Sequence, residues 1–223
     1  TPKGSYWMPA SSDFVLHWDL AEQESHIYGT GWRAAQRGDV VLDCGANIGV
    51  YTRVALEAGA KLVVAIEPSP DNLECLRRNL EPEIKTGRVI IYPKGVWDKD
   101  DELTFRVDPK NSAANTFVVE RPDLVESGKL PLTTIDKLAG ELKLERVDYI
   151  KMDIEGAEPR ALQGAKETIQ RFHPRLAISV YHTPTDRDTI PQIIASISPS
   201  YKKECGQCSM HEWNIFPMVY FFR

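Results

Sequence analysis

The chain has 223 residues, of which 42% are hydrophobic and 26% are charged, a balance that lets one domain bury a full core. Its 27 Lys and Arg against 32 Asp and Glu give a net charge of −5. Because the two signs are interspersed without a basic run, we expect no nucleic-acid partner. No apolar stretch approaches a membrane span and residues 1–4 open no signal segment, so we expect no membrane partner and a cytoplasmic location.

The first informative element follows the apolar run at residues 40–42. Residues 43–49 form a small-residue turn, Asp-Cys-Gly-Ala-Asn-Ile-Gly, and residues 50–58 are predicted as a helix. A strand that ends in such a turn and feeds a helix N-terminus makes a site for a nucleotide-like ligand.

The glycine spacing narrows the class of ligand. A dinucleotide fingerprint beginning at Gly45 needs two further glycines where this chain has Asn47 and Val50. The phosphate loop that ends in Gly-Lys-Ser/Thr is also missing here. An acidic strand end with glycines four apart suits a ligand carrying a cation or an amine, such as S-adenosylmethionine, whose ammonium Asp43 could hold directly or through water. The alternative is that Gly45 and Gly49 only tighten the turn.

The next two predicted strands add contacts for the rest of such a ligand. Residues 61–66 form an apolar strand that ends at Glu67 and Pro68, about twenty residues after the glycine turn, where an acidic side chain meets a ribose diol. Residues 88–92 form the third strand. The residues beyond it that we expect to contact the adenine are Gly95, Val96 and Asp98.

The middle of the chain changes character. Residues 102–107 alternate polar and apolar like a half-exposed strand. The turn-rich residues 108–116 are either a lid or wall of a substrate site or a plain surface loop. A short helix is predicted to start at residues 133–136 and to run to Leu142. Residues 147–152 are predicted as a fourth core strand, which places Asp153 at its C-terminal end.

The remaining predicted elements complete an α/β alternation. Pro159 fits the first turn of a helix that we expect to run to about Phe172. Residues 175–180 form a fifth strand, which brings His182 to the same sheet edge as Asp153. The last apolar strand is predicted over residues 216–222.

Methyl transfer from a sulfonium to oxygen is an in-line displacement, so a protein with such a ligand must align the acceptor and deprotonate it. His182 is the leading candidate for the base, because its ordinary pKa is close to neutral. The alternative is that it donates to a neighbouring carbonyl. Asp153 is expected to contact the methionine end of the ligand or the acceptor hydroxyl.

The charged residues around Asp153 have structural as well as functional interpretations. Glu155 and Glu158 could cap a helix N-terminus, where its dipole stabilises carboxylates. Lys151 lies in an apolar strand and must be paired, and we predict Glu155 or Glu158 as its partner. Asp153 with His182 and His211 could also bind a divalent metal, but no diagnostic spacing supports it, so we expect no metal.

Three segments together resemble a known family: residues 43–49, the Glu-Pro-Ser-Pro turn at residues 67–70, and Ile-Lys-Met-Asp-Ile-Glu-Gly-Ala-Glu at residues 150–158. They are similar to the FkbM family of S-adenosylmethionine-dependent methyltransferases, over about residues 38–186. The resemblance implies an α/β Rossmann-like sheet of seven strands, parallel except for one reversed strand near the C-terminus, with helices on both faces. It also implies O-methylation of natural products, sugars or lipids, and it favours a functional role for His182 over a purely structural one.

On this basis we predict an N-terminal extension at residues 1–38, which packs on the domain or covers the active site, and a methyltransferase domain at residues 39–223. The predicted activity is O-methylation of a small molecule, natural product or sugar, with S-adenosylhomocysteine as the second product. The alternative is a non-catalytic protein that binds S-adenosylmethionine. The partner is a small-molecule or glycan acceptor, and a homodimer is an open alternative to a monomer.

The predicted site has three groups of residues. Those with a predicted catalytic role are His182, Asp153 and Lys151. Those predicted to contact S-adenosylmethionine are Asp43, Gly45, Ala46, Asn47, Gly49, Tyr51, Thr52, Glu67, Pro68, Gly95, Val96, Asp98 and Asp153. Those predicted to contact the acceptor are Glu155, Glu158, Ser112, Asn115 and His211.

The four cysteines are too few for a disulfide scaffold, so we expect free thiols. Cys205 and Cys208, followed by His211, have the spacing of metal ligands. A structural zinc site needs a fourth ligand, which is not found nearby in the sequence.

Overall fold

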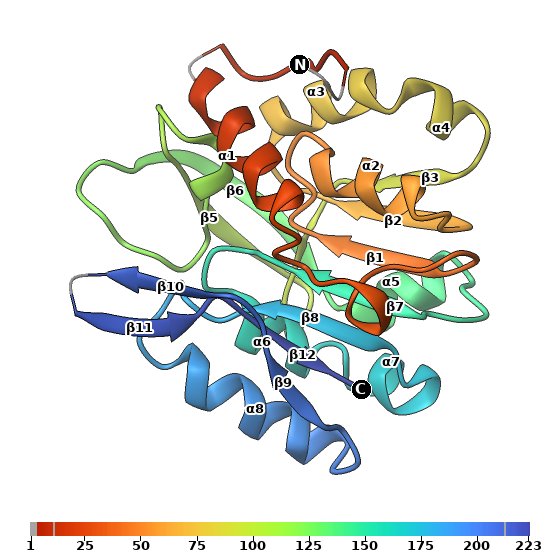
Figure 1. The fold of residues 1–223 in the computed structure, drawn as a ribbon. Helices are drawn as coiled ribbons and strands as arrows, with labels where there is room; N and C mark the ends of the chain where they lie inside the picture. Colours follow the sequence, from red (N-terminus) through yellow and green to blue (C-terminus); the bar gives the residue numbers. More distant parts are fainter. Residues whose placement is uncertain (1–3, 11, 212) are drawn as a thin grey trace.

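The computed structural model describes residues 4–10, 12–211 and 213–223, without the side chains of residues 13 and 211. Helices and strands alternate along most of the chain (Figure 1). The helical elements, two of them single 3-10 turns, are α1 (Asp13–Glu24), η1 (Gly31–Arg33), α2 (Val50–Glu57), α3 (Pro70–Asn79), α4 (Glu81–Lys85), η2 (Ser112–Ala114), α5 (Ile135–Glu141), α6 (Glu158–Gln163), α7 (Lys166–Phe172) and α8 (Asp186–Ile197).

The strands fall into one large sheet and two small ones. The large sheet holds β1 (Val40–Cys44), β2 (Leu62–Ile66), β3 (Val89–Tyr92), β7 (Tyr149–Met152), β8 (Arg175–Ser179), β9 (Lys203–Cys205) and β12 (Val219–Phe222). The small sheets hold β4 (Gly95–Val96), β5 (Asp101–Val107) and β6 (Val125–Thr133), and the hairpin of β10 (Cys208–His211) and β11 (Asn214–Pro217).

The large sheet has the order β3-β2-β1-β7-β8-β12-β9. Its strands are parallel except β12, which runs antiparallel to both of its neighbours. This confirms the predicted seven-stranded sheet with one reversed strand. The strand order switches direction between β1 and β7, and in open α/β sheets ligands bind at the carboxyl ends of the strands at such a point.

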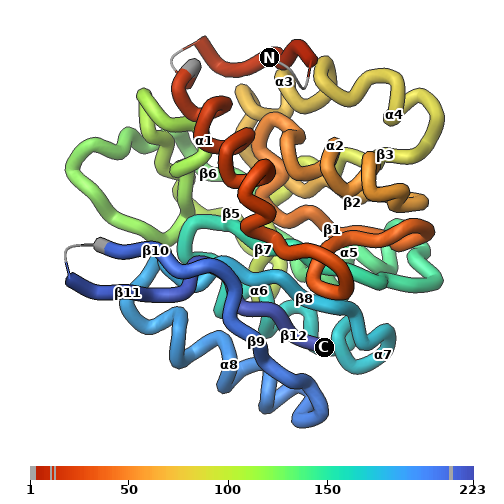
Figure 2. The backbone as a smooth tube through the Cα atoms, in the orientation of Figure 1, coloured from red at the N-terminus to blue at the C-terminus, as the bar shows by residue number. Residues whose placement is uncertain are grey.

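Helices cover both faces of this sheet, because side chains alternate along each strand. Val41 and its equivalents on β2 and β3 face a core built with α2 and α3. Leu42 and its equivalents face the opposite core, which α5, α6, α7 and α8 complete. Figure 2 follows the chain through these layers, from the red N-terminal segment beside α2 and α3 to the blue strands around α8.

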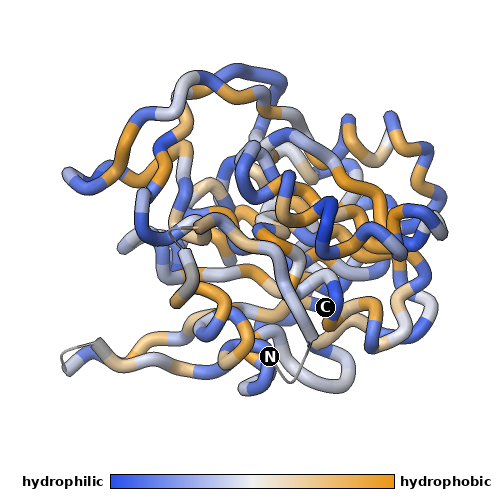
Figure 3. Tube along the Cα trace, turned by 90° about the horizontal axis from the view of Figure 1, so that it is seen from above, coloured by the Kyte–Doolittle hydropathy of each residue, from blue (hydrophilic) through white to orange (hydrophobic). Residues whose placement is uncertain are grey.

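The hairpin of β10 and β11 stands out from the body of the molecule (Figure 3). Among its described side chains, Met210, Trp213 and Ile215 are exposed. The helices of the described ranges include none that is both long and apolar enough to span a membrane.

Two predicted elements are divided in the structure. The helix expected from Pro159 to Phe172 is two helices, because Gly164 packs on the backbone of Trp97, where an added Cβ would lie 2.0 Å from the carbonyl oxygen. Asp136 then accepts bonds from the N–H groups of Glu167 and Thr168 and starts α7. The strand expected over residues 216–222 is also two elements, since β11 pairs with β10 and only β12 joins the large sheet.

Helix α1 is an element that the sequence pattern did not predict. Its buried residues include Val15 and Leu16, but Phe14 and Trp18 are exposed. With apolar residues on both faces, the helix lacks the stripe that marks an amphipathic helix. It lies beside α2 (Figure 1).

We predict that Gly45→Ala destabilises the fold more than Gly38→Ala does. Both glycines have positive φ, +80° and +88°, so alanine is strained at both by about 1 kcal/mol. At Gly45 the new Cβ would meet the carbonyl oxygen of Asp153 at 1.9 Å, whereas no atom of the described residues lies within 4 Å at Gly38. Chemical denaturation should show that Gly45→Ala lowers the free energy of unfolding by about 1–3 kcal/mol more than Gly38→Ala does. Equal losses would contradict this packing of β1 on the end of β7.

Candidate active site

A cavity of about 860 Å³, part of it open to solvent, lies at the carboxyl ends of β1, β2 and β7. Its lining includes thirteen of the predicted site residues, namely Gly45, Ala46, Asn47, Tyr51, Glu67, Pro68, Gly95, Val96, Ser112, Asn115, Lys151, Asp153 and Glu155. The predicted residues that do not line it are Asp43, Gly49, Thr52, Asp98, Glu158 and His182, and the side chain of His211 lies outside the described part.

The glycine turn is fixed by the neighbouring strand. The N–H groups of Gly45 and Ala46 both donate to the carbonyl oxygen of Ile66, at 3.0 Å. Gly49 is the N-cap of α2 with φ +94°, and an added Cβ would lie 2.9 Å from Leu76 Cδ1. Gly49 therefore tightens the turn, as the structural alternative held, and has no contact with the cavity.

Glu67 links the turn to the end of β2. Its carboxylate accepts from the N–H groups of Asn47 at 3.0 Å and Ser69 at 2.9 Å. Burial raises the pKa of Glu67 to about 7, although the hydrogen bonds from Ser69 and Asn47 act to lower it. Within the described part of the chain, the side-chain oxygens of Asn47 and Asn72 are buried without a hydrogen-bond partner. Both residues line the cavity, so they offer acceptors to a bound molecule.

The prediction that Lys151 pairs with Glu155 or Glu158 is wrong. Lys151 lies directly opposite Asp43 in the register of β7 and β1, so their side chains share one face. The Lys151 Nζ atom is 3.3 Å from Asp43 Oδ1 and donates to the carbonyl oxygen of Gly45 at 2.8 Å. Burial opposes protonation of Lys151, but the Asp43 and Asp153 carboxylates raise its pKa overall.

Asp43 does not reach the cavity, which corrects its predicted contact with an ammonium group. Its side chain is fully buried, and Thr52 donates to its Oδ2 atom at 2.6 Å. Asp43 and Thr52 therefore support the site from behind. Asp98, predicted beside the adenine, instead forms an ion pair with Arg160 at 2.7 Å and also lies away from the cavity.

Glu158 organises the junction between β7 and α6. It is fully buried, and its carboxylate accepts from the N–H groups of Ile154 at 2.8 Å and Gly156 at 3.0 Å. The same carboxylate lies 2.9 Å from Nδ1 of His182. Glu158 thus cannot contact an acceptor directly, contrary to its prediction, and it positions the turn and the imidazole.

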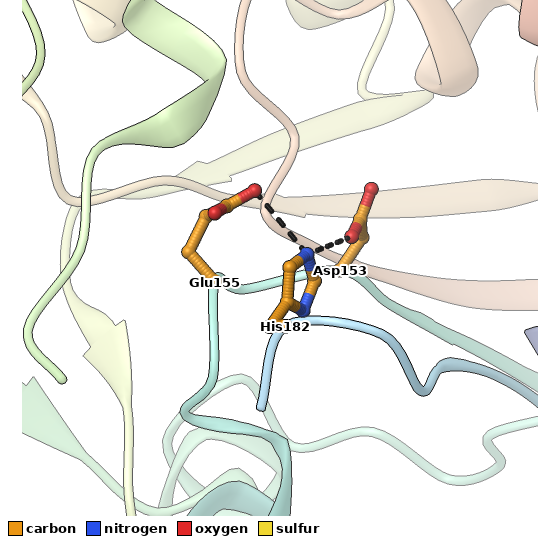
Figure 4. Close-up of side chains that lie close together, drawn as sticks. All are labelled: Asp153, Glu155 and His182. Atoms are coloured by element: carbon orange, nitrogen blue, oxygen red, sulfur yellow. Dashed lines mark ion pairs between the residues drawn. The ribbon is translucent and has the colours of Figure 1, made fainter. Parts of the chain in front are cut away.

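Three side chains converge at the cavity wall (Figure 4). The Nε2 atom of His182 lies 3.2 Å from Asp153 Oδ1 and 3.3 Å from Glu155 Oε1. Tyr28 donates to the other oxygen of Asp153 at 2.6 Å. The side chain of His182 is only 3% exposed, whereas those of Asp153 and Glu155 are 21% and 23% exposed. The two carboxylates therefore face the cavity, and the imidazole lies behind them.

The charges of this cluster are strongly coupled. Burial opposes the charge on His182, but the carboxylates of Glu158, Glu155 and Asp153 raise its pKa well above the ordinary value. Burial likewise opposes ionisation of Asp153, but His182 and Lys151 lower its pKa overall. A raised pKa favours the imidazolium form, in which both ring nitrogens carry a proton, and this argues against the predicted role of His182 as the base.

The sequence reasoning missed two acidic residues of α1, Asp19 and Glu22, which line the cavity. Burial is the main cause that raises the pKa of each to about 7, and the Asp153 carboxylate adds to the shift. No sequence signal marked them, because α1 itself lacks a clear amphipathic pattern.

The sign of the Glu67 shift predicts how stability depends on pH. Its folded pKa of about 7 lies above the ordinary 4.5, so the unfolded chain loses this proton first and stability falls as pH rises from 4.5 to 7. The contribution is about 3 kcal/mol. Denaturation at several pH values should therefore show a smaller fall for Glu67→Gln than for the wild type.

The matched control for that experiment is Glu120→Gln, whose side chain is 81% exposed. It should keep the pH dependence of the wild type. An unchanged slope in Glu67→Gln would contradict the burial of an ionisable carboxyl group at the end of β2.

Relatives with known structure share this architecture. Methyltransferase FkbM from Methylobacillus flagellatus superposes with a TM-score of 0.61 at 24% identity, over 98% of this chain and 56% of that one. A Streptococcus mutans protein described as a methyltransferase, in complex with SAH, gives a TM-score of 0.52 at 14% identity, over 91% and 96% of the two chains. These similarities show the fold.

Two curated relatives are similar in sequence. One is the AMB antimetabolite synthetase AmbE of Pseudomonas aeruginosa, 28% identical over 163 residues, which are 56% of this chain and 8% of AmbE. The other is the 2-O-methyltransferase NoeI of Sinorhizobium fredii, 29% identical over 152 residues, 59% of each chain. The chain thus spans less than two thirds of either relative. Residues 43–207 match the Methyltransferase FkbM domain, and the chain belongs to this family of methyltransferases.

Proposed function

We propose that this chain is an S-adenosylmethionine-dependent O-methyltransferase that acts on a hydroxyl group of a small molecule or glycan. The observation that carries the proposal is the pair of carboxylates, Asp153 and Glu155, on the wall of the cavity that also holds Glu67, with His182 in contact behind them. The two ends of this cavity offer the two kinds of contact that such a reaction needs, one for the donor and one for the acceptor.

The cavity residues fit the donor. Glu67 ends β2, where its carboxylate would accept the ribose hydroxyls. Gly95 and Val96 also line the cavity, and their backbone groups would contact the adenine. The unpartnered oxygens of Asn47 and Asn72 would accept hydrogen bonds from the donor's hydroxyl or amino groups. When bound, S-adenosylmethionine supplies an electrophilic methyl group on a sulfonium. The SAH complex of the Streptococcus mutans protein supports this choice of ligand.

Lys151 is the cation at the methionine end of the cavity. Its ammonium lies beside the glycine turn and over the rings of Tyr28 and Tyr51, at 5.3 and 5.8 Å from their centroids. Asp43 keeps it charged. Lys151 would therefore bind the carboxylate of the methionine moiety and leave the ammonium to Asp19 of α1, which also lines the cavity.

The acceptor hydroxyl is oriented by the carboxylates of Asp153 and Glu155, which face the cavity. Its proton passes to Glu22, because a carboxyl group with a pKa of about 7 is matched to general base catalysis near neutral pH. The printed activity of NoeI, a 2-O-methyltransferase, supports oxygen as the atom that receives the methyl group.

The experiment that tests the function combines calorimetry with SAH and transfer of labelled methyl from S-adenosylmethionine to a panel of sugars and hydroxylated small molecules. We predict that Glu67→Gln weakens SAH binding about tenfold, since hydrogen bonds to a charged group are lost. Glu22→Gln should lower kcat about 100-fold with little change in SAH affinity.

Glu120→Gln, at an exposed position outside the cavity, is the control and should match the wild type in both measurements. Methyl label found on nitrogen, or no binding of SAH by the folded protein, would contradict the proposal. Tight SAH binding with no transfer to any acceptor would favour the alternative of a non-catalytic binding protein.

A further inference from the structure

We propose that Asp153, Glu155 and His182 form a binding site for a hard divalent cation such as Mg²⁺ or Mn²⁺. This differs from the sequence-based expectation of no metal, and Glu155 takes the place of His211 in the ligand set considered there. Binding of the cation stands on the geometry below. Only its use in methyl transfer rests on the proposed function.

The donor atoms have the separations of ligands around one ion. One atom from each residue lies within 4.8 Å of the other two, and Nε2 of His182 is 3.2 Å from Asp153 Oδ1 and 3.3 Å from Glu155 Oε1. Ligands at about 2.1 Å from an ion and at right angles lie about 3 Å apart. The two distances to Nε2 therefore match neighbouring positions of an octahedral site, and the convergence is visible in Figure 4.

Two of these atoms have no hydrogen bond within the described part of the chain. They are Nε2 of His182 and Oδ1 of Asp153. The His182 side chain is only 3% exposed, so it has little access to bulk water. The other oxygen of Asp153 is bonded to Tyr28, which leaves Oδ1 directed at the cluster. A cation between Nε2 and the two carboxylates would satisfy all three.

The second nitrogen of the ring is held in the manner of metal-binding histidines. Glu158 Oε1 lies 2.9 Å from Nδ1, and a carboxylate beside one ring nitrogen fixes the orientation of the ring in metal-binding histidines. Nε2 faces the two carboxylates of Asp153 and Glu155. A cation that takes the place of the Nε2 proton would bind all three groups.

Glu155 is held in place by its own backbone. It has φ +55°, uncommon for a residue with a side chain, and Gly156 follows with φ +92°. Thr116 donates to the Glu155 carbonyl oxygen at 2.7 Å, and Glu158 holds the N–H of Gly156. The turn therefore fixes Glu155 before any ion arrives, which lowers the entropic penalty of binding.

A second group of possible ligands nearby, Glu158, His182 and Asp186, is less suited. Both oxygens of Glu158 accept backbone N–H groups. Asp186 accepts from the N–H and hydroxyl of Thr183. These carboxylates are committed to the turns that start α6 and α8, so the ion belongs with Asp153 and Glu155.

The chemistry of the donors selects the class of ion. Two carboxylates and one imidazole, without a thiolate, suit Mg²⁺ or Mn²⁺ rather than a soft metal. Because the carboxylates are partly exposed to the cavity and the imidazole is buried, the remaining coordination positions face the cavity. An acceptor oxygen placed there would lose its proton more easily.

The test is a titration of the full chain with MnCl₂ in the presence of SAH, followed by electron paramagnetic resonance of free Mn²⁺ and by calorimetry. We expect one site in the wild type and at least tenfold weaker binding in Glu155→Gln. The matched control is Glu22→Gln, which removes a carboxylate of the same cavity outside the ligand set and should change the affinity less than threefold.

His182→Ala should also lose the site, but it leaves Glu158 buried without its partner, so folding is checked by circular dichroism and Glu155→Gln remains the decisive variant. No Mn²⁺ binding at millimolar concentration, or equal affinity in Glu155→Gln and the wild type, would overturn the proposal. Methyl transfer that persists in chelator without Mn²⁺ binding would reject the ion and keep the proposed function. Mn²⁺ binding by a protein that does not bind SAH would support the cation site and reject the proposed function.

Discussion

The buried carboxylate of Glu158 is the interaction on which the geometry of this site depends. It accepts the N–H groups of Ile154 and Gly156 and lies against Nδ1 of His182, so one side chain joins the loop after β7 to the loop after β8. Removal of a buried charged partner usually costs about 3–5 kcal/mol. Here it would also release the turn that directs Asp153 and Glu155 at the cavity.

A second constraint holds the other half of the site. The ion pair of Asp43 and Lys151 joins the centre strands β1 and β7, and Lys151 also bonds the carbonyl oxygen of Gly45. Gly45 in turn packs so closely on Asp153 that no side chain fits there. The glycine turn after β1 and the loop that carries Asp153 and Glu155 are thus packed against each other. Each fixes the position of the other, at the point where the strand order switches direction between β1 and β7.

Much of the fold could be predicted because its strands are short, apolar and separated by clear helices. The α/β class followed from that alternation, and the seven-stranded sheet with one reversed strand was implied by the family resemblance. What depends on packing between distant segments could not be predicted. The partner of Lys151 is set by strand register, and the break at Gly164 is set by the backbone of Trp97. Neither is visible in local sequence.

The site divides in the same way. Residues in the turns after β1, β2 and β7 were found because strand ends meet at one sheet edge. Asp98 was misplaced because its partner Arg160 lies 62 residues away in the sequence. Asp19 and Glu22 were missed because α1 shows no regular stripe. The predicted ligand contacts of Asp43 and Glu158 were wrong because both side chains are fully buried. They support the site from behind and do not line the cavity.

In the proposed function, the methyl donor shares one cavity with the carboxylates of Asp153 and Glu155. A crystal structure of the chain with SAH bound would test this arrangement. We expect the ribose at Glu67, the adenine beside Gly95 and Val96, and the sulfur facing Asp153 and Glu155. SAH bound elsewhere, or bound with its sulfur directed away from these two carboxylates, would contradict it.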